Sequence, residues 1–285
     1  MTSGWAQVDL HLHTTASDGR LTPQQIVQLL ARRGVKYAAI TDHDTTEGLV
    51  EAFAEAKKFP SLKLVPGIEM STDIPGSEVH MLGLFVDQYD AGLQAELQRF
   101  RERRFDRGQQ MVKKLTELGY PLEWDAVKRI AGEASIGRPH VALAMVERGY
   151  VSGTQEAFDR FLGRNGPAYA EREKMTPVEA VIMIQKYKGL PVLAHPSFTE
   201  NVESILPALC EAGLVGIEVF YKNYPPDLVG WLLLLAQRHN LIPSGGTDFH
   251  GLGTRGEVEP GAAGPPVAVF QRLEQLAAAM RSTVQ

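Results

Sequence analysis

The chain is poor in cysteine and lacks any apolar stretch long enough to cross a membrane. Cys210 is the only cysteine among 285 residues, which excludes an intramolecular disulfide and suits a reducing compartment. Even the apolar stretch "LVGWLLLLAQRHN" falls short of the ~20 residues that span a bilayer. The first residues, "MTSGWAQVDL", have neither the charged nor the apolar part of a signal peptide. We therefore expect a cytoplasmic protein without a membrane partner.

The sequence also lacks an excess of basic residues. Asp and Glu number 34 against 29 Lys and Arg, which gives a formal net charge of −5. A surface that binds long duplex DNA through its overall positive charge is therefore not expected. Hydrophobic residues make up 44% of the chain. That share is enough to bury a full core, either in one large domain or in a domain with an insertion.

Two familiar catalytic patterns are missing as well. The chain has no G-x-S-x-G elbow, and Cys210 lies within a predicted helix, "SILPALCEAG". The segment "GLGTRG", residues 251–256, has the spacing of a dinucleotide-binding motif, but "EVEPGAAGPP" follows it where that motif requires a helix. We interpret this segment as a loop and expect chemistry that needs no serine or cysteine nucleophile.

Short apolar runs alternate with helical patterns along most of the chain. The predicted strands are "AQVDLH", "KYAAIT", "KLVPGIE", "EVHMLGLF", "LPVLAH", "VGIEVF" and "LIPSGG". Two intervening helices begin with the same capping pattern, at Thr22-Pro23 and at Thr176-Pro177. Strands separated by amphipathic helices predict βα units in a largely parallel sheet. The repetition of these units favours a barrel.

This alternation stops between about residues 90 and 172. Apolar residues at helical spacing mark one face of a long helix: Leu93, Leu97, Phe100, Met111, Leu115 and Leu118. Shorter helices are expected at 124–131, 139–148 and 155–162, and no strand is expected. We interpret residues 91–171 as a helical insertion domain that interrupts a barrel formed by residues 1–90 and 172–285.

Histidines and carboxylates gather at the predicted strand ends. In "VDLHLHTTASDG", His11 and His13 share one face, because side chains alternate along a strand. The carboxyl ends of strands converge on one site in barrel folds. We therefore expect a single cluster of ten side chains: His11, His13, Asp18, His43, Glu69, His80, His140, His195, Asp248 and His250.

The composition of this cluster indicates a metal centre for phosphoryl chemistry. Imidazole and carboxylate ligands without thiolate favour zinc, manganese or iron. Ten side chains are too many for one tetrahedral ion, so we expect two to three divalent ions. Ions about 3.5–4 Å apart bind the attacking and leaving oxygens of a phosphoryl group and lower the pKa of a bound water. Hydroxide would then be the nucleophile.

The motifs also resemble a known family. "DLHLHTTASDG", "AITDHDT", "GIEMS", "HMLG", "GRPHVA", "LAHP" and "GGTDFHG", in this order, are similar to those of the PHP (polymerase and histidinol phosphatase) metal-dependent phosphoesterases. The pattern is most similar to the nucleoside 3′,5′-bisphosphate phosphatases, a branch that includes 5′-to-3′ exoribonucleases acting on short RNA. The resemblance spans nearly the whole chain. It implies an α/β fold, a distorted seven-stranded (β/α) barrel with a small helical insertion, and a site for three ions.

The resemblance further implies how the ligands share these ions. One ion would be held by His11, His13, Glu69 and Asp248. Glu69 would bridge to a second ion, held also by His80 and His140. The third would be held by Asp18, His43, His195 and His250. The residues implied to be catalytic are Asp18, His43, Glu69, His195 and Asp248.

Basic residues of the insertion are candidates for substrate binding. Arg104 and Arg107 continue the apolar face of the long helix, although the highly charged run "RFRERRFDRGQQMVKK" is also compatible with a solvated face. Arginine binds phosphate bidentately. Arg138, which lies two residues before His140, is a stronger candidate for this role. Further candidates are Arg172, Lys174 and Lys222. Asp42 and Asp44, which flank His43, either orient imidazoles or simply stabilise a turn.

Three functions are compatible with these features. The first is hydrolysis of nucleoside 3′,5′-bisphosphates, or release of nucleotides from the 5′ end of short RNA, by a metal-bridging hydroxide. The second is a histidinol-phosphate phosphatase, which the nucleotide-type insertion and its arginines disfavour. The third is a non-catalytic module that binds metal or nucleic acid, whose mark would be the loss of ligands. All ten ligand positions are present, so we expect an enzyme whose partner is a small phosphorylated nucleotide or short RNA.

Overall fold

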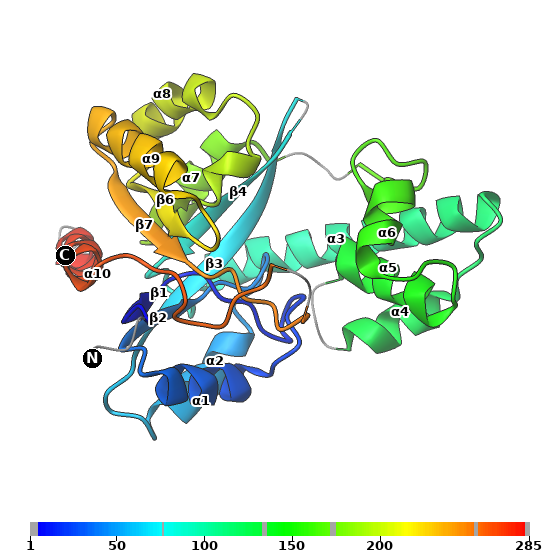
Figure 1. The fold of residues 1–285 in the computed structure, drawn as a ribbon, viewed down its shortest axis with the longest axis horizontal. Coiled ribbons are helices and arrows are strands. Elements are labelled where there is room, and N and C mark those ends of the chain that lie inside the picture. Colours follow the sequence, from blue (N-terminus) through cyan, green and yellow to red (C-terminus); the bar gives the residue numbers. More distant parts are fainter. Residues whose placement is uncertain (1–4, 76, 133–135, 172–174, 254–255, 283–285) are drawn as a thin grey trace.

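The computed structural model describes residues 5–75, 77–132, 136–171, 175–253 and 256–282. A nearly closed barrel of seven strands is surrounded by helices, and a helical insertion projects from one side of it (Figure 1). None of the described helices is both long and apolar enough to span a membrane.

The strands lie side by side in the order in which they occur in the sequence. They are β1 (Val8–Asp9), β2 (Tyr37–Ile40), β3 (Lys63–Ile74), β4 (Ser77–Leu84), β5 (Leu190–Leu193), β6 (Gly216–Tyr221) and β7 (Ile242–Gly246). Neighbours are parallel except at β4, which is antiparallel to both β3 and β5. All seven expected strands are present, and the expected α/β barrel is confirmed. The antiparallel β4 arises because a tight connection, too short for a crossover helix, joins it to β3.

The first and last strands are joined just beyond their ends. The backbone N–H of Leu10 donates to Gly245, and that of Asp248 donates to His11. The buried carboxylate of Asp9 accepts hydrogen bonds from the backbone and side chain of Thr247 and from the backbone of Gly261. These contacts place the segments after β1 and β7 next to each other.

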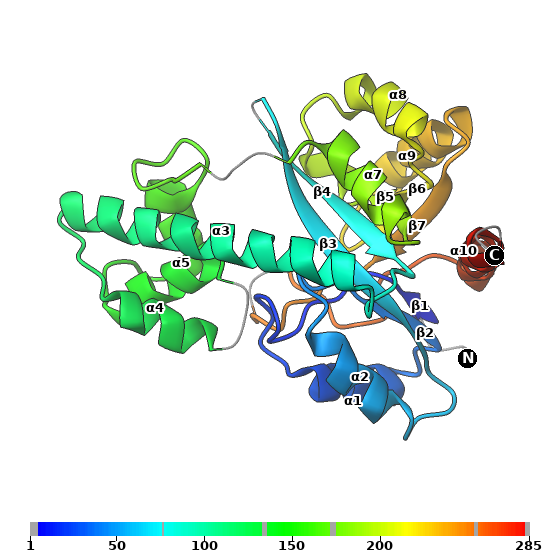
Figure 2. The same cartoon turned by 180° about the vertical axis from the view of Figure 1, so that it is seen from behind.

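Six helices cover the outside of the barrel (Figures 1 and 2). They are α1 (Pro23–Arg33), α2 (Gly48–Ala56), α7 (Pro177–Lys186), α8 (Val202–Ala212), α9 (Pro226–Arg238) and α10 (Val267–Ser282). Thr22 and Thr176 cap α1 and α7 through the capping boxes expected from the sequence. The helices bury their apolar faces on the sheet and leave its carboxyl ends free to carry polar side chains.

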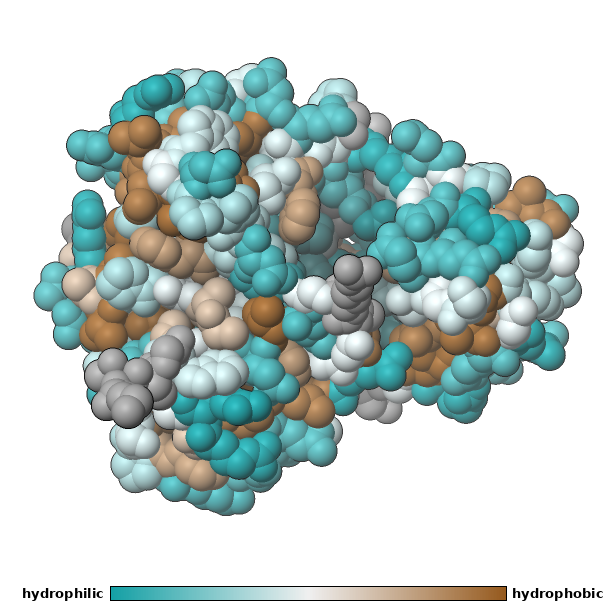
Figure 3. All heavy atoms as spheres, in the orientation of Figure 1, coloured by the Kyte–Doolittle hydropathy of each residue, from teal (hydrophilic) through white to brown (hydrophobic). Residues whose placement is uncertain are grey.

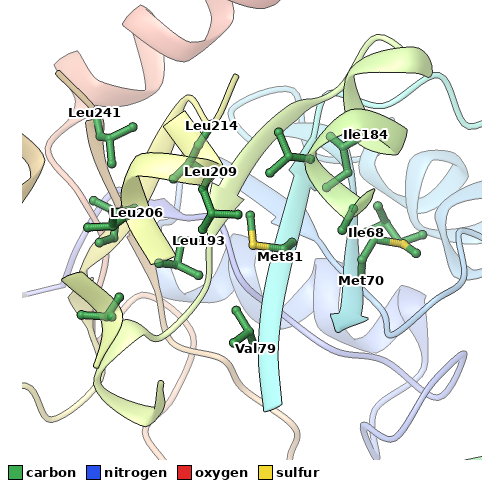
Figure 4. Close-up of a cluster of buried hydrophobic side chains, with 14 of the residues drawn as sticks. Ile68, Met70, Val79, Met81, Ile184, Leu193, Leu206, Leu209, Leu214 and Leu241 are labelled. Carbon is green, nitrogen blue, oxygen red and sulfur yellow. The ribbon is translucent and has the colours of Figure 1, made fainter. Parts of the chain in front are cut away.

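A buried core holds β3 and β4 beneath α7 and α8 (Figure 4). Ile68 and Met70 of β3 pack there together with Met81 of β4 and Leu209 of α8. Burial of each such side chain contributes about 1.5–3 kcal/mol. Glu69 lies between Ile68 and Met70, so the alternation of the strand directs it to the opposite, inner face of the barrel.

The long helix α3 (Ala91–Glu117) connects the barrel to the insertion (Figure 2). Leu93 and Leu97 in its first turns pack in the barrel core, whereas Met111 and Leu115 pack in a separate core within the insertion. Leu118, expected on the buried face, is 42% exposed, because the helix ends at Glu117.

The remaining insertion helices lie close to their expected positions. They are α4 (Trp124–Ala131), α5 (Arg138–Glu147), α6 (Thr154–Ala157) and a π-helical turn at Phe158–Leu162. No strand occurs among the described residues between 91 and 171. A hollow bordered largely by hydrophilic side chains separates the barrel from this insertion (Figure 3).

Candidate metal centre

Glu69, in the middle of β3, is the centre of a histidine cluster inside the barrel. Its side chain is only 1% exposed. Five imidazole rings lie 2.9–3.2 Å from its carboxylate oxygens: those of His11, His13, His43, His80 and His195. They come from β4 and from the segments after β1, β2 and β5. The structure thus brings together residues from four parts of the chain, as expected for strand ends that converge.

The geometry of His11, His13, Glu69 and Asp248 fits a metal ion. Nε2 of His11 and Nε2 of His13 lie 3.1 Å apart, and each is 3.2 Å from Oε2 of Glu69. Oδ1 of Asp248 lies 3.4 Å from the first nitrogen and 3.1 Å from the second. A tetrahedron with edges of about this length has its centre about 2 Å from each corner, the usual distance between zinc and nitrogen or oxygen ligands. These four residues are the set expected to share an ion.

Two further groups of possible ligands adjoin the first. In one, Asp18 lies with His250 and His43, at 3.3 Å from Nε2 of His250 and 3.8 Å from Nε2 of His43; His13 also belongs to this group. The other consists of His43, Glu69 and His80. Because His13, His43 and Glu69 each occur in two groups, the three groups form one continuous cluster.

Several buried atoms of the cluster need a partner that the described residues do not provide. Nδ1 of His13, Nδ1 of His43 and Oε2 of Glu69 make no hydrogen bond among those residues. Burial of polar atoms without partners is costly. Divalent cations would satisfy them, so the residues present fit the metal ions that the sequence predicts.

The electrostatics of the cluster favour positive charge between its side chains. Burial by itself raises the pKa of Glu69, but the neighbouring His43 and His11 hold it well below its usual value. The pKa values of Asp18 and Asp248 are lowered in the same way, against the effect of burial, by neighbouring histidines. All three carboxylates are therefore ionised at neutral pH and available to a cation.

The histidines divide into two kinds. Burial tends to lower the pKa of His13, but the adjacent carboxylates of Asp248 and Glu69 raise it to about 10. Burial lowers the pKa of His43 to about 3, against the attraction of Glu69 and Asp18. At pH 7 in the metal-free protein His13 therefore carries a proton, whereas His43 is neutral.

Metal binding is expected to release at least about one proton per protein at pH 7, because His13 must lose its proton to become a ligand. Metal affinity should therefore increase at least about tenfold per pH unit between pH 7 and 9, below the pKa of His13. Calorimetric titration with Mn²⁺ in buffers of different ionisation enthalpy measures the proton count. A His239→Asn variant, altered outside the cluster, should show the same count. Affinity that is independent of pH would contradict the prediction.

Glu218 belongs to the site although sequence reasoning missed it. This carboxylate of β6 is fully buried and accepts a hydrogen bond from Nδ1 of His11 at 3.1 Å. It also accepts one from the backbone N–H of His195 at 2.7 Å. Because Nδ1 carries the proton of this hydrogen bond, the lone pair of His11 Nε2 is directed at the cluster. Carboxylates orient metal-bound histidines in the same way. A signal was available, because "GIEV" in β6 repeats the "GIEM" around Glu69.

Replacement of Glu218 by glutamine should weaken metal binding about 10- to 100-fold, because the neutral amide no longer stabilises the Nδ1–H donor of His11. Metal content after dialysis against a graded chelator measures the change. Glu203→Gln, on the outer helix α8, is the matched control and should bind metal as the wild type does. Unchanged affinity in the Glu218 variant would show that this contact does not support a ligand.

His195 lies in a different part of the cluster from the one implied by the resemblance. Its Nε2 is 3.1 Å from Oε1 of Glu69, and its ring centroid lies 5.1 Å from that of His80. It occurs in none of the three groups found among the described residues, that of Asp18 and His250 included. The reason is positional: His195 follows β5, which pairs with β4, the strand that carries His80.

His140 also differs from the grouping that the resemblance implied. It occurs in none of the three groups found in the described part of the chain. It lies in the first turn of α5, where its Nδ1 accepts a hydrogen bond from the backbone N–H of Gly137 at 2.9 Å. Burial lowers its pKa, and its charged neighbours include Asp18 and Arg104. Its place in the first turn of an insertion helix puts it near Asp18 and Arg104.

Lys222 and Tyr221 hold Asp248 in place. Nζ of Lys222 donates to the backbone oxygen and to Oδ2 of Asp248, at 2.8 and 3.1 Å. The hydroxyl of Tyr221 donates to the same Oδ2 at 2.6 Å. Oδ1 is left to face the imidazoles. Lys222, expected to bind substrate, is thus placed against a candidate metal ligand.

A cavity of about 90 Å³ lies between the cluster and the insertion. Asp18, His43 and His80 line it on the barrel side. The insertion and β4 contribute further side chains, among them Glu78, Arg104, Arg107, Arg138 and Phe158. A cavity of this size admits more than one water molecule.

Three of the four arginines expected from the sequence, Arg104, Arg107 and Arg138, line this cavity. Arg104 donates from Nε to Asp44 at 2.6 Å and from Nη2 to Ser71 at 2.7 Å. Arg107 donates to the backbone oxygen of Ala170 at 2.8 Å. Arg138 pairs with Glu78. The charged stretch of α3 is therefore not entirely a solvated face, whereas Arg172 and Lys174 lie outside the described residues.

Asp42 and Asp44 stabilise the walls of the site. Asp42 accepts hydrogen bonds from the backbone of Thr14 at 2.7 Å and from Ser17 at 2.6 Å, which holds the loop that carries Asp18. Asp44 binds Arg104. The turn-stabilising alternative is the one seen for Asp42.

The fold and the site together define a metal-dependent hydrolase built on an α/β barrel. A sequence model of the PHP domain matches residues 9–153. The chain belongs to the PHP domain family, and it is a metal-dependent phosphoesterase. The resemblance noted in the sequence is thereby confirmed, whereas the sharing of ligands among ions stays a prediction.

Curated relatives cover most of the chain. The 3′,5′-nucleoside bisphosphate phosphatase of Chromobacterium violaceum is 33% identical over 88% of this chain and 90% of its own length. The 5′-3′ exoribonuclease Rnm of Salmonella typhimurium is 32% identical over 85% of this chain and 84% of its own length. A phosphoribosyl 1,2-cyclic phosphate 1,2-diphosphodiesterase of Eggerthella lenta is 34% identical over 85% and 94%.

A solved structure agrees with the fold. A protein from Bifidobacterium adolescentis, assigned as a metal-dependent phosphoesterase, superimposes with a TM-score of 0.85 at 29% sequence identity. The match covers 93% of this chain and 94% of the other. It therefore includes the insertion as well as the barrel.

Proposed function

We propose that the enzyme removes phosphate from nucleoside 3′,5′-bisphosphates or releases nucleotides from the 5′ end of short RNA. The observation that carries this proposal is the shared cavity, in which three arginines face candidate metal ligands. A substrate with two phosphate groups one sugar apart would place one at the cluster and the other toward the arginines. Two curated relatives named for such substrates support the same choice.

The proposed centre contains two to three manganese, iron or zinc ions. One would be held by His11, His13, Glu69 and Asp248, and a second by Glu69, His80 and His195. A third would be held by Asp18, His43 and His250, with His140 at the edge of the cavity. When bound, the ions would supply a water nucleophile at neutral pH and positive charge for the phosphoryl oxygens.

The protein's own side chains position both the ligands and the substrate. Glu218 fixes the tautomer of His11, and Tyr221 with Lys222 fixes the rotamer of Asp248. Arg104 and Arg138 come from α3 and α5, so the insertion, residues 91–171, acts as a substrate cap. Its guanidinium groups neutralise phosphate oxygens that are not at the metal centre.

A substrate panel tests the proposal, with the metal content measured on the same sample. Adenosine 3′,5′-bisphosphate and a 5′-phosphorylated RNA trinucleotide should be hydrolysed with the highest kcat/KM. Histidinol phosphate and phosphoribosyl 1,2-cyclic phosphate represent the alternative phosphatase and the third relative. A higher kcat/KM for either of these two would overturn the proposed substrate class.

A further inference from the structure

An exposed aromatic ring stands beside the metal centre and has no part in the proposed chemistry. Phe198 is 63% exposed and ends the short helical turn η2 (Pro196–Phe198), directly after His195. A single exposed apolar side chain is ordinary on a protein surface. The position of this ring beside candidate metal ligands is the feature that needs explanation.

The ring lies at the rim of the cluster. The centroid of the Phe198 ring is 5.4 Å from that of His195, and the two ring planes form an angle of 48°. It is 6.0 Å from the centroid of Tyr221, and these two planes form an angle of 86°. The backbone oxygen of Phe198 accepts a long hydrogen bond from Ser77 at 3.5 Å. Ser77 precedes Glu78, which binds Arg138 in the cavity. Phe198 therefore lies between the metal-binding side of the site and the start of β4.

The turn that carries the ring is firmly held. His195 has a positive φ of 25°, which turns the chain outward immediately after the ligand. The backbone N–H of Phe198 donates to the carbonyl of His195 at 3.0 Å, and that of Ser197 donates to the hydroxyl of Tyr224 at 3.3 Å. A fixed aromatic ring with most of its surface free is a suitable platform for a planar ligand.

We propose that Phe198 stacks against the nucleobase of the substrate. Only one imidazole separates its ring from Glu69, so the group that reaches it belongs to the same molecule as the phosphate at the metal centre. Aromatic side chains bind bases by stacking without a strong preference among the four bases. This inference rests on the proposed function and deepens it, because it makes the base, and not only the phosphates, a determinant of specificity.

The test compares 2′-deoxyadenosine 3′,5′-bisphosphate with abasic deoxyribose 3′,5′-bisphosphate. In the wild type, kcat/KM for the base-bearing compound should exceed that for the abasic one about tenfold. Phe198→Ala should reduce this ratio to within about twofold through a higher KM for the nucleotide, and Phe198→Trp should restore it. A variant that merely disturbed His195 would lower both rates and leave the ratio unchanged.

Tyr89 provides a matched control. It is 75% exposed and precedes α3, about 20 Å along that helix from Arg104. Tyr89→Ala should keep the wild-type ratio. Equal rates for the two compounds in the wild type, or a wild-type ratio in Phe198→Ala, would overturn the role of Phe198 while the proposed function stands. Hydrolysis of neither compound would overturn both.

Discussion

Glu69→Gln is expected to lower kcat/KM at least about a thousandfold. Five imidazoles lie within 3.2 Å of the Glu69 carboxylate, and Glu69 occurs in two of the three ligand groups found among the described residues. Glutamine keeps the shape but removes the charge that balances the cations. A loss of about 4 kcal/mol of transition-state stabilisation corresponds to this factor. Initial rates with adenosine 3′,5′-bisphosphate, beside the metal content of each sample, measure the effect.

The control for this prediction is a glutamate of the same charge outside the site. Glu203→Gln, on the outer helix α8, should retain the wild-type rate and metal content. Circular dichroism of the Glu69 variant shows whether its fold is kept. A folded Glu69→Gln protein with wild-type activity would show that the carboxylate of Glu69 is not required as a metal ligand.

Removal of the metal ions should abolish phosphate release, and their return should restore it. Four candidate ligand atoms, of His11, His13, Glu69 and Asp248, are spaced like the corners of a tetrahedron whose centre lies about 2 Å from each, the distance at which zinc binds such atoms. Dialysis against a chelator, followed by separate addition of Mn²⁺, Fe²⁺ and Zn²⁺, gives the activity supported by each metal.

A variant separates loss of metal from loss of the site. His11→Ala/His13→Ala should stay inactive after any metal is added, whereas the stripped wild type recovers. A stripped enzyme with undiminished activity would show that the chemistry needs no metal. Near-normal phosphate release from the double variant would place the reaction away from this cluster.

The strands and most of the cluster were predictable from the sequence because the relevant signals are local. The alternation of "VDLHLH" assigns His11 and His13 to one face of a strand, and the inner position of Glu69 follows from Ile68 and Met70 on either side. Parallel strands point the same way in a barrel, so their ends meet. The same reasoning applies to Glu218 between Ile217 and Val219, which was overlooked because no histidine accompanies it.

Other features could not be predicted from local patterns. The reversal of β4 depends on the short connection to β3, and it places His80 beside His195. The direction of α3 places Arg104 and Arg107 in the wall of the cavity beside the cluster, although the same helix carries many solvated charges. The contact between Lys222, a candidate for substrate binding, and Asp248 arises because Lys222 follows β6, which pairs with β7.

The sequence by itself determined which residue types stand at the strand ends, because periodicity and capping act over a few neighbouring residues. Those residue types identified imidazole–carboxylate metal chemistry and the family. Only the tertiary structure decided which ligands meet. His195 lies beside Glu69 and His80, whereas His140 lies on an insertion helix. Contacts between residues far apart in the chain depend on strand pairing and helix direction. For the same reason, only the folded protein placed Phe198 at the rim of the site.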